Sequence, residues 1–432
     1  MTKLNNFSSL DSSTVARATD EFGTPVYLYD ESTIQRRCYE CLSMPNAFGL
    51  TVRYAMKANS NRSLLKLISA AGLHFDASSL NEVIRANVAG IPYDRIMLTS
   101  QEVHEGADKE KLNELLLRGL NYNVCSLRQL QLIADFAAAN GIEPGIRIHP
   151  GIGSGESATR NTGDDYACFG VHLSNVEKAL DLAGAKGLRF RHIHEHIGSG
   201  ADSEIWRQNI DLELDIISKY FPDAETVCFG GGLKEARMPD EHAADVESLG
   251  SYARDRIENF YKATGRKLRM EIEPGAYIIA NSGYVLTRVI DKKSTSRSNF
   301  IITDGGMEVN ARPLLYGSRH PVYIISSDGA NVKSSEFYAA ESGYEAVVAG
   351  KCCESGDCQT LDPDGHSIAR LMAEPETGDI AVIGGVGAYC SSMTPFNYNS
   401  HTQIPEVLFT ADGKLKLIRR RQTLEQMLEN EV

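Results

Sequence analysis

The sequence predicts an α/β protein built from a parallel (β/α)8 TIM barrel and a mostly antiparallel β-domain. Between residues 50 and 273, short β-branched runs alternate with longer helical patterns. Strict alternation of this kind predicts parallel strands joined by right-handed crossovers, and the number of units favours a closed barrel over an open sheet. After residue 280, strand-like runs follow one another with few helices between them. The 432 residues of the chain have room for both domains.

The barrel elements follow from hydrophobic periodicity. Runs of β-branched and aromatic residues predict barrel strands at 52–56, 74–77, 95–98, 122–125, 145–149, 189–194, 226–229 and 270–273. Apolar residues spaced three and four apart predict helices at 63–71, 81–89, 110–118, 127–139, 175–185, 204–220 and 248–264. In such a barrel the active site lies where the strands end and the loops begin.

The second domain is predicted from strand-like runs at 283–290, 300–302, 322–325, 345–349 and 379–383. A further run at 25–29 precedes the barrel and can join that domain from the N-terminal side. We therefore expect an N-terminal segment, 1–34, that contributes to the β-domain, a barrel over 35–282 and a C-terminal β-domain over 283–432.

The composition is that of a soluble globular protein, with 42% hydrophobic and 23% charged residues. A net charge of −13 argues against nucleic acid or an anionic membrane as the main partner. No signal peptide is expected in residues 1–17, and no run of about 20 apolar residues occurs. Nine scattered cysteines fit a reducing cytoplasm, and the pair Cys38 and Cys41 is interpreted as packing rather than as a metal site.

Lys57 stands at the end of the first expected barrel strand. A solvated charge is the commoner role of a lysine. An enzyme that uses pyridoxal phosphate (PLP), however, needs a lysine whose amine is held neutral enough to attack an aldehyde, and burial at a strand end would supply that.

Three histidines alternate along the strand expected at 189–194 and just beyond it, at positions 192, 194 and 196. Alternate residues share one face of a strand, so a metal cluster is geometrically possible, but no carboxylate or cysteine pair completes it in an obvious way. We expect no metal, and instead expect His196 to lie against a cofactor ring, with Ser199 near a phosphate.

Glycines 230–232 and Glu273 follow two further strands. Backbone N–H groups of consecutive glycines can approach a phosphate closely, although a tight turn gives the same pattern. A carboxylate aimed at a pyridine nitrogen keeps that nitrogen protonated, which makes PLP an electron sink. Pro274 and Gly275 end the strand there, so Glu273 is expected at the catalytic face.

The β-domain adds polar segments at 304–307, 312–316, 352–357 and 387–393. Each alone fits an ordinary loop. Together they supply a guanidinium for a carboxylate, a thiol that can carry a proton, a carboxylate for an ammonium group and two phenols.

In this combination and order, the segments resemble the fold-type III PLP decarboxylases, most closely the diaminopimelate decarboxylase family. The resemblance runs from residues 24–27 to residues 405–408. Its most specific parts are Tyr-Ala-Met-Lys-Ala-Asn at 54–59, Cys-Cys-Glu-Ser-Gly-Asp at 352–357 and the segment 387–393. It implies a barrel of the alanine racemase type, a cytoplasmic homodimer with active sites at the subunit interface, and decarboxylation of meso-2,6-diaminopimelate to L-lysine and CO2.

The resemblance also assigns roles by position. It makes Lys57 the Schiff-base lysine, Glu273 the partner of the pyridine nitrogen and Cys353 the donor of a proton to Cα, acting across the dimer interface. It places around the cofactor His196, Ser199, Gly231, Gly232, Gly275, Ala276 and Tyr389. It places around the far end of the substrate Arg312, Tyr316, Glu354 and Tyr389.

One position departs from the family pattern. The family usually has Arg after Glu-Pro-Gly, whereas this chain has Ala276. Losing that partner of a substrate carboxylate would forfeit about 1.5–3 kcal/mol. Either another basic residue replaces it, with Arg147 and Arg160 in a candidate segment, or the substrate lacks that carboxylate.

Three alternatives stay open at this point. A decarboxylase of lysine, ornithine or a D-diamino acid fits Ala276, but Arg312 and the segment 352–357 oppose it. An amino acid racemase would place Arg against the pyridine nitrogen, and Glu273 opposes that. A non-catalytic homologue would tend to lose the lysine or the thiol, and both are present.

Overall fold

The computed structural model describes residues 4, 9–153, 161–164, 166–198, 202–336 and 343–432. The chain divides into two compact units, each of which is described by itself. One unit comprises Arg37–Lys234 and Ala243–Tyr277. The other comprises Met1–Arg36, Glu235–His242 and Ile278–Val432. The helices α2 (Glu31–Leu42) and α10 (Ala276–Ile279) contain the two outer boundaries.

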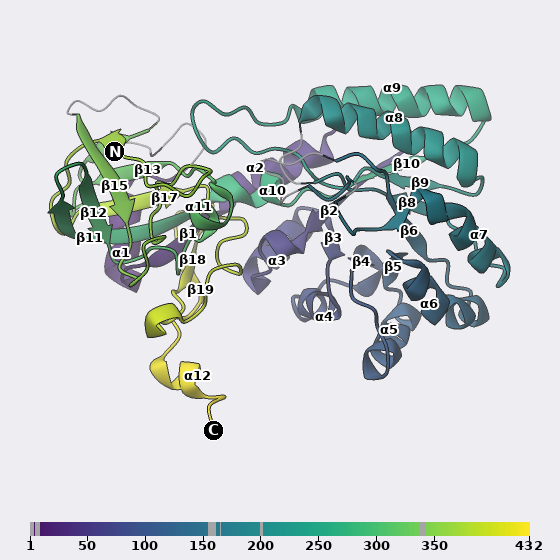
Figure 1. Cartoon of the computed structure of the whole chain (residues 1–432), viewed down its shortest axis with the longest axis horizontal. Coiled ribbons are helices and arrows are strands. Elements are labelled where there is room, and N and C mark those ends of the chain that lie inside the picture. The colour runs from purple at the N-terminus through teal and green to yellow at the C-terminus, as the bar shows by residue number, and fades with distance from the viewer. Residues whose placement is uncertain (1–3, 5–8, 154–160, 165, 199–201, 337–342) are drawn as a thin grey trace. The chain divides into compact units, whose positions relative to one another are not determined.

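The first unit is a closed parallel barrel (Figure 1). Within the described residues its eight strands pair in the order β2-β3-β4-β5-β6-β8-β9-β10, and β10 pairs back onto β2. The two-residue strand β7 (Val171–His172) pairs with β6 outside this ring. The ring strands are β2 (Leu50–Ala55), β3 (His74–Ala77), β4 (Ile96–Thr99), β5 (Asn121–Val124), β6 (Gly145–His149), β8 (His192–His194), β9 (Thr226–Cys228) and β10 (Arg269–Ile272). The predicted closed barrel is therefore confirmed.

Amphipathic helices surround these strands (Figure 1). They are α3 (Arg62–Ala70), α4 (Leu80–Val88), α5 (Ala107–Leu117), α6 (Leu127–Asn140), α7 (Val176–Gly184), α8 (Ser203–Tyr220) and α9 (Val246–Thr264). Several begin at a side chain that accepts a hydrogen bond from the first turn, as Ser79 does before α4 and Ser126 before α6. Such caps satisfy backbone donors that a helix start leaves unpaired. They also fix where each loop on the catalytic face ends.

The second unit is built on a mostly antiparallel sheet. Its main path runs β14-β13-β17-β11-β1-β18-β19, and β12, β15 and β16 branch from β11. β1 (Val26–Asp30) pairs antiparallel with β11 (Gly283–Ser294) and parallel with β18 (Glu406–Phe409), so the N-terminal strand belongs to this sheet. The other strands are β12 (Asn299–Thr303), β13 (Val322–Ile325), β14 (Val332–Ser335), β15 (Tyr344–Ala349), β16 (Arg370–Met372), β17 (Ile380–Gly384) and β19 (Leu415–Arg419).

Helix α1 (Ser12–Phe22) packs on this sheet with Val15 and Ala18 in the shared core. The other helices of the unit are α11 (Arg312–Tyr316) and α12 (Leu424–Leu428).

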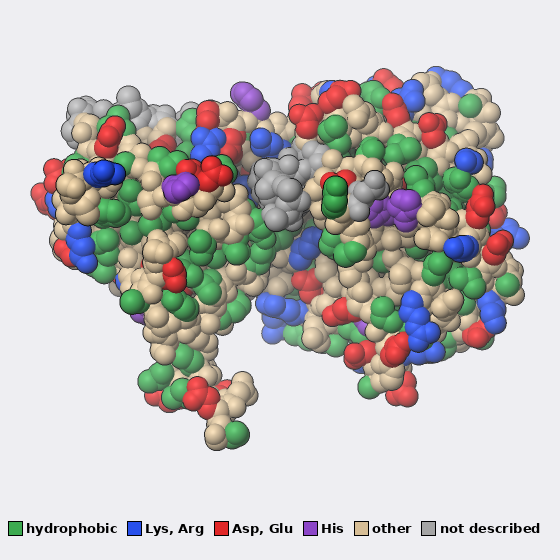
Figure 2. Space-filling model, in the orientation of Figure 1, with side chains coloured by type: hydrophobic (Ala, Val, Ile, Leu, Met, Phe, Trp, Pro, Cys, Tyr) green, Lys and Arg blue, Asp and Glu red, His purple; other side chains and the backbone are tan. Residues whose placement is uncertain are grey.

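On the face in view, acidic and basic side chains are interspersed over each unit (Figure 2), so the excess of acidic residues is not gathered in one patch there. None of the helices described has the length and apolar character that crossing a membrane requires.

Candidate active site

Lys57 lies at the catalytic end of the barrel, but its surroundings differ from the expectation. Strand β2 ends at Ala55, whose N–H donates to the carbonyl of Pro274, and Lys57 follows in a 3-10 turn over Met56–Ala58. Its side chain is exposed, so the predicted burial of the amine is wrong. The turn carries Lys57 past the strand end and out of the packed interior. The charge of Lys57 acts to lower the pKa values of Asp76, Glu82 and Glu273, so these three carboxyl groups are its electrostatic neighbours.

Glu273 is a buried carboxylate with one oxygen bound and one without a partner among the described residues. It directly follows β10, and its N–H donates to the carbonyl of Gly230. Oε2 accepts from Nε2 of His194 at 2.8 Å, whereas Oε1 is buried with no hydrogen-bond partner in the described part of the chain. Burial works to raise the pKa of Glu273, but His194 and the charge of Lys57 outweigh it and lower the pKa to about 2. Glu273 is therefore ionised, with Oε1 available to a donor.

His196 is held as a neutral ring by the glycine turn. Its Nδ1 accepts from the N–H of Gly231 at 3.1 Å. Burial, together with the nearby charges of Lys57 and Arg147, holds the pKa of His196 well below its usual value. Both observations place the ring proton of His196 on Nε2. A neutral imidazole can lie flat against an aromatic ring without bringing a positive charge next to that ring.

The glycines of the site allow close approaches that a side chain would block. A Cβ at Gly231 would lie 2.5 Å from the carbonyl oxygen of Glu273, and Gly232 has φ +89°. A Cβ at Gly275 would lie 3.3 Å from the Cβ atoms of Ala55 and Ala58. Ser199 lies outside the described residues. Gly231, Gly232 and Gly275 therefore form a backbone-lined rim beside Glu273.

Two buried residues of the barrel had little or no part in the predicted site. Asp76 was not predicted to belong to it, and Arg147 was predicted only as a candidate replacement for the Arg missing at position 276. Asp76, on β3, has Oδ1 buried without a partner among the described residues, and burial and Glu273 raise its pKa well above the usual range. Arg147, on β6, has Nε and Nη2 buried without a partner there, and its guanidinium lies over the ring of Phe169. Polar atoms buried without partners are uncommon in proteins. These atoms are available to bind a polar ligand in this part of the barrel.

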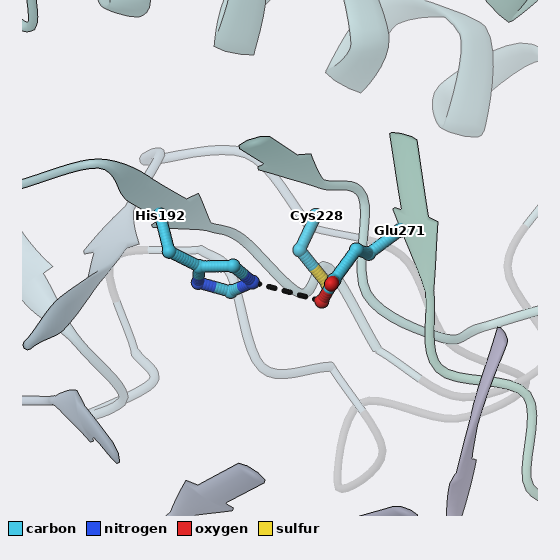
Figure 3. A group of neighbouring side chains, drawn as sticks. All are labelled: His192, Cys228 and Glu271. Carbon is cyan, nitrogen blue, oxygen red and sulfur yellow. Dashed lines mark hydrogen bonds and ion pairs between the residues drawn. The ribbon is translucent and has the colours of Figure 1, made fainter. Parts of the chain in front are cut away.

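A second layer of polar side chains lies deeper in the barrel (Figure 3). Nε2 of His192 and Oε2 of Glu271 are 2.9 Å apart, and the thiol of Cys228 lies within 4.8 Å of both groups. This is a donor set that zinc can use. However, Arg53 donates to both oxygens of Glu271, at 2.7 and 3.0 Å. The guanidinium of Arg53 thus occupies the place of a cation beside this carboxylate.

In the β-rich unit, the structure brings Arg312, Tyr316 and Tyr389 together. Arg312 begins α11, and its guanidinium carbon lies 5.6 Å from the ring centre of Tyr316 and 5.9 Å from that of Tyr389. Its Nη2 donates to Oγ of Ser318 at 3.1 Å. Tyr389 has φ +58°, a conformation that is uncommon for residues other than glycine and that often marks functional sites. Arg312 is thus fixed by aromatic and polar contacts before any ligand binds.

Cys353 and Glu354 lie on an exposed loop of the same unit. The N–H of Cys353 donates to Oδ1 of Asn399 at 2.7 Å. The base of the loop is held by Asp357, whose Oδ2 accepts from the N–H of Cys352 at 2.6 Å and whose Oδ1 accepts from Met307. The thiol of Cys353 is therefore presented on a backbone that is fixed on both sides.

Ala276 is the first residue of α10 and offers no polar group. The next residue, Tyr277, is buried and carries the guanidinium of Arg37 over its ring at 4.7 Å. Arg37 donates to Glu40 at 2.7 Å, so this guanidinium already pairs with a carboxylate. The side chain at position 276 therefore cannot bind a carboxylate as the Arg of the family pattern would.

Comparison with known proteins identifies the family. The model of the pyridoxal binding domain of pyridoxal-dependent decarboxylases matches residues 31–280. The chain therefore belongs to the pyridoxal-dependent decarboxylases. Relatives that it matches over nearly their full length include diaminopimelate decarboxylases: that of Escherichia coli K12 is 34% identical over 98% of both chains, and that of Streptomyces coelicolor is 32% identical over 98% of this chain and 93% of its own.

Solved structures give the same result. The crystal structure of a diaminopimelate decarboxylase superposes with a TM-score of 0.90 at 32% identity, over 100% of this chain and 99% of that chain. The Helicobacter pylori diaminopimelate decarboxylase, in complex with L-lysine, superposes with a TM-score of 0.78 at 28% identity, over 96% and 98%.

The barrel residues fit the cofactor of this family, pyridoxal 5'-phosphate. Oε1 of Glu273 is a buried acceptor without a donor in the described structure, which suits a protonated pyridine nitrogen. Gly231, Gly232 and Gly275 have no side chain that would shield their backbone N–H groups from a phosphate. Lys57 is an accessible amine in the same barrel.

Sequence reasoning did not assign a role to His194. The alternation of histidines at positions 192, 194 and 196 was the signal that could have singled it out together with His196.

Proposed function

We propose that this protein decarboxylates meso-2,6-diaminopimelate to L-lysine and CO2, with pyridoxal phosphate held by Lys57. The observation that carries the proposal is the barrel constellation of Lys57, His196 and the half-bound carboxylate of Glu273, in a chain similar to diaminopimelate decarboxylases over its whole length. When bound, the cofactor supplies a sink for the electron pair left at Cα as CO2 departs.

The barrel residues would hold the cofactor. Lys57 would form the covalent link, the open Oε1 of Glu273 would accept from the ring nitrogen, and the neutral ring of His196 would lie against the cofactor ring. The residues assigned to the surroundings of the cofactor in addition are Ser199, Gly231, Gly232, Gly275, Ala276 and Tyr389. The left-handed backbone of Tyr389 supports its assignment, since such strain is common where a side chain is aimed at a ligand.

The β-rich unit would supply the proton and the grip on the substrate. The thiol of Cys353 gives a proton to Cα after the bond to the carboxylate breaks, and regains one from solvent. Arg312 and Tyr316 bind the distal carboxylate, and Glu354 binds the distal ammonium group. We infer that the thiol of Cys353 reaches Cα across the interface of a homodimer. The exposure of Cys353 and Glu354 supports this, because a partner subunit can reach them.

Ala276 makes substrate choice the point to test. Of the two candidate replacements, Arg160 lies outside the described residues, whereas Arg147 offers buried guanidinium nitrogens without partners in the described structure. If Arg147 does not reach the substrate carboxylate, Ala276 favours a decarboxylase of lysine, ornithine or a D-diamino acid.

The deciding experiment measures CO2 release by the PLP-loaded protein offered meso-diaminopimelate, L-lysine, D-lysine, L-ornithine and D-ornithine in parallel. Release from meso-diaminopimelate alone supports the proposal. Release only from a substrate without the second carboxylate would make Ala276 the specificity change and overturn it.

We also infer a cytoplasmic setting. All nine cysteines are free thiols, and six of them are buried. A reducing compartment keeps such thiols free. Fractionation of cells that carry a tagged copy of the full chain tests this inference, and recovery from an oxidising compartment would contradict it.

A further inference from the structure

We propose that His194 is a positioning residue that keeps Glu273 ionised and leaves Oε1 as the oxygen offered to the ring nitrogen of the cofactor. This inference rests on the proposed function, in which Glu273 is the partner of that nitrogen. His194 itself touches neither cofactor nor substrate in this scheme and acts only through Glu273.

The contact is fixed by the strands that carry it. His194 ends β8 and Glu273 follows β10, and β9 lies between these two strands in the barrel. Both side chains are buried in the barrel unit, and His192 shares the face of His194 because the two alternate along β8. Nε2 of His194 and Oε2 of Glu273 are 2.8 Å apart, and the side chains are 1% and 7% exposed. No solvent competes for this hydrogen bond.

The hydrogen-bond roles settle where the protons are. An ionised carboxylate only accepts, so Nε2 of His194 carries the hydrogen. Nδ1 of His194 is buried and has no partner among the described residues, and burial lowers the pKa of His194. His194 is therefore a neutral imidazole with one defined tautomer. It directs its single N–H at Oε2, which leaves Oε1 as the open acceptor.

Glu273 needs this donor because several other acids face it. Burial disfavours the ionised form of Glu273, and its charge in turn favours the protonated forms of the nearby Asp76 and Glu213. Lys57 opposes these effects from the catalytic face. A hydrogen bond to the ionised form favours that form over the neutral one. Without His194 the balance moves toward a protonated carboxyl group, which would no longer hold a proton on the ring nitrogen.

The test compares two cofactors that differ only at the ring nitrogen. Dissociation constants of pyridoxal phosphate and of its 1-deaza analogue, which has a C–H in place of that nitrogen, are measured for the full-length apo-protein by absorbance titration. For His194→Leu we expect pyridoxal phosphate to bind about 10- to 100-fold more weakly, since a charge-assisted hydrogen bond network is lost. The analogue should weaken less than about threefold.

Matched variants separate this role from a merely structural one. His194→Gln can still donate to Oε2 and should keep pyridoxal phosphate affinity within about threefold of the parent protein. His192→Leu removes the histidine two residues away on the same face, which contacts Glu271 instead, and should affect both cofactors equally. Equal weakening of both cofactors in His194→Leu, or no rescue by His194→Gln, would overturn the inference.

Glu273→Gln tells the two possible failures apart. If this variant weakens pyridoxal phosphate selectively and His194→Leu does not, the role of His194 is wrong and the proposed function stands. If Glu273→Gln does not distinguish the two cofactors, Glu273 does not face the ring nitrogen. That outcome removes the assignment in the proposed function, together with the inference that depends on it.

Discussion

Charged side chains in the barrel interior are the main residue-scale feature of this protein. Barrels of this kind are usually filled by branched apolar side chains. Here Arg53, Glu271 and His192 form a hydrogen-bonded layer, and His194 and Glu273 form another. Buried charges are costly unless they are paired. Removing one member of either layer should therefore leave an uncompensated polar or charged group in the barrel interior.

Removing one partner of the deeper layer should therefore destabilise the fold. Glu271→Gln leaves the buried guanidinium of Arg53 uncompensated, since it donates to both oxygens of Glu271. We expect the free energy of unfolding in urea to fall by about 3–5 kcal/mol. The double variant Arg53→Met, Glu271→Leu should lose less than Glu271→Gln alone. An equal or greater loss in the double variant would mean that packing, not charge, dominates at this site.

The same ion pair predicts a dependence of stability on pH. Burial works to raise the pKa of Glu271, but Arg53 and His192 outweigh it and hold the pKa far below its usual range. A carboxylate with a lowered folded pKa stabilises fully above its unfolded pKa of about 4.3, and this contribution is lost as the pH falls toward the folded value. Between pH 6 and pH 3 the parent protein should lose more free energy of unfolding than Glu271→Gln. Parallel pH profiles would contradict this.

A glycine of the site gives a second residue-scale prediction. In Gly231→Ala the new Cβ would lie 2.5 Å from the carbonyl oxygen of Glu273, so the backbone must shift. We expect a loss of about 1–3 kcal/mol of stability and weaker binding of pyridoxal phosphate. Gly184→Ala, at the end of α7, meets no atom of the described residues within 4 Å and should be neutral or stabilise by up to about 1 kcal/mol. A Gly231→Ala protein as stable as the parent would show that the rim has free space.

Residue patterns predicted the positions of polar residues at the strand ends better than the layer beneath them. Lys57 and Glu273 follow strand ends that turn residues mark clearly in the sequence. Arg53 and Glu271 lie inside strands, where a charged residue is normally expected to face solvent. Only the closure of the barrel reveals that they point inward and meet, because β2 and β10 are far apart in the sequence and adjacent in the ring. The exposure of Lys57 depends on a 3-10 turn that periodicity does not indicate.

At the scale of elements, several strands with buried apolar faces were predicted, whereas β14, β16, β18 and β19 were not. β13 (Val322–Ile325) is buried along its whole length and was predicted with its observed bounds. β16 and β19 include exposed residues and lack a continuous apolar run. Helix α1 was also not predicted, because its buried face is formed largely by small and hydroxyl side chains such as Ser12, Thr14 and Ala18. These elements form because the sheet supplies their partners.

The loop that carries Cys353 is the element that most directly limits the proposed chemistry. Asp357→Ala would leave the N–H groups of Met307 and Cys352 without their acceptor. We expect about 1–3 kcal/mol less stability in urea unfolding. Turnover should fall more than KM changes, because the thiol acts after the substrate has bound.

An exposed aspartate of the same unit serves as the control for this loop. Asp364→Ala should leave stability within about 0.5 kcal/mol of the parent protein, as surface substitutions usually do. If Asp357→Ala keeps full turnover at unchanged stability, the loop does not depend on this carboxylate.

At the scale of the whole molecule, the chain runs from the β-rich unit into the barrel and back. The sequence texture marks the change from alternating elements to strands near residue 280, and the division between the units falls at 277 and 278. The short segment Glu235–His242 belongs to the β-rich unit although the expected barrel range contains it. Its Glu235 and Arg237 bind Asn281 and the carbonyl of Gly385, contacts between residues far apart in sequence that no local pattern reveals.

The proposed homodimer makes a quantitative prediction about mixed subunits. If each active site takes Lys57 from one subunit and Cys353 from the other, Lys57→Ala and Cys353→Ala should each be nearly inactive. A heterodimer of the two has one intact site and one site with both changes, as the twofold symmetry of such a dimer requires. After random subunit exchange half of the dimers are mixed, so CO2 release should recover to about a quarter of the parent rate. Exchange itself is checked by native mass spectrometry.

A mixture of Lys57→Ala and Glu273→Gln, both in the barrel unit, is the control and should recover no CO2 release. Full exchange without recovery in the first mixture would place each complete site within a single subunit.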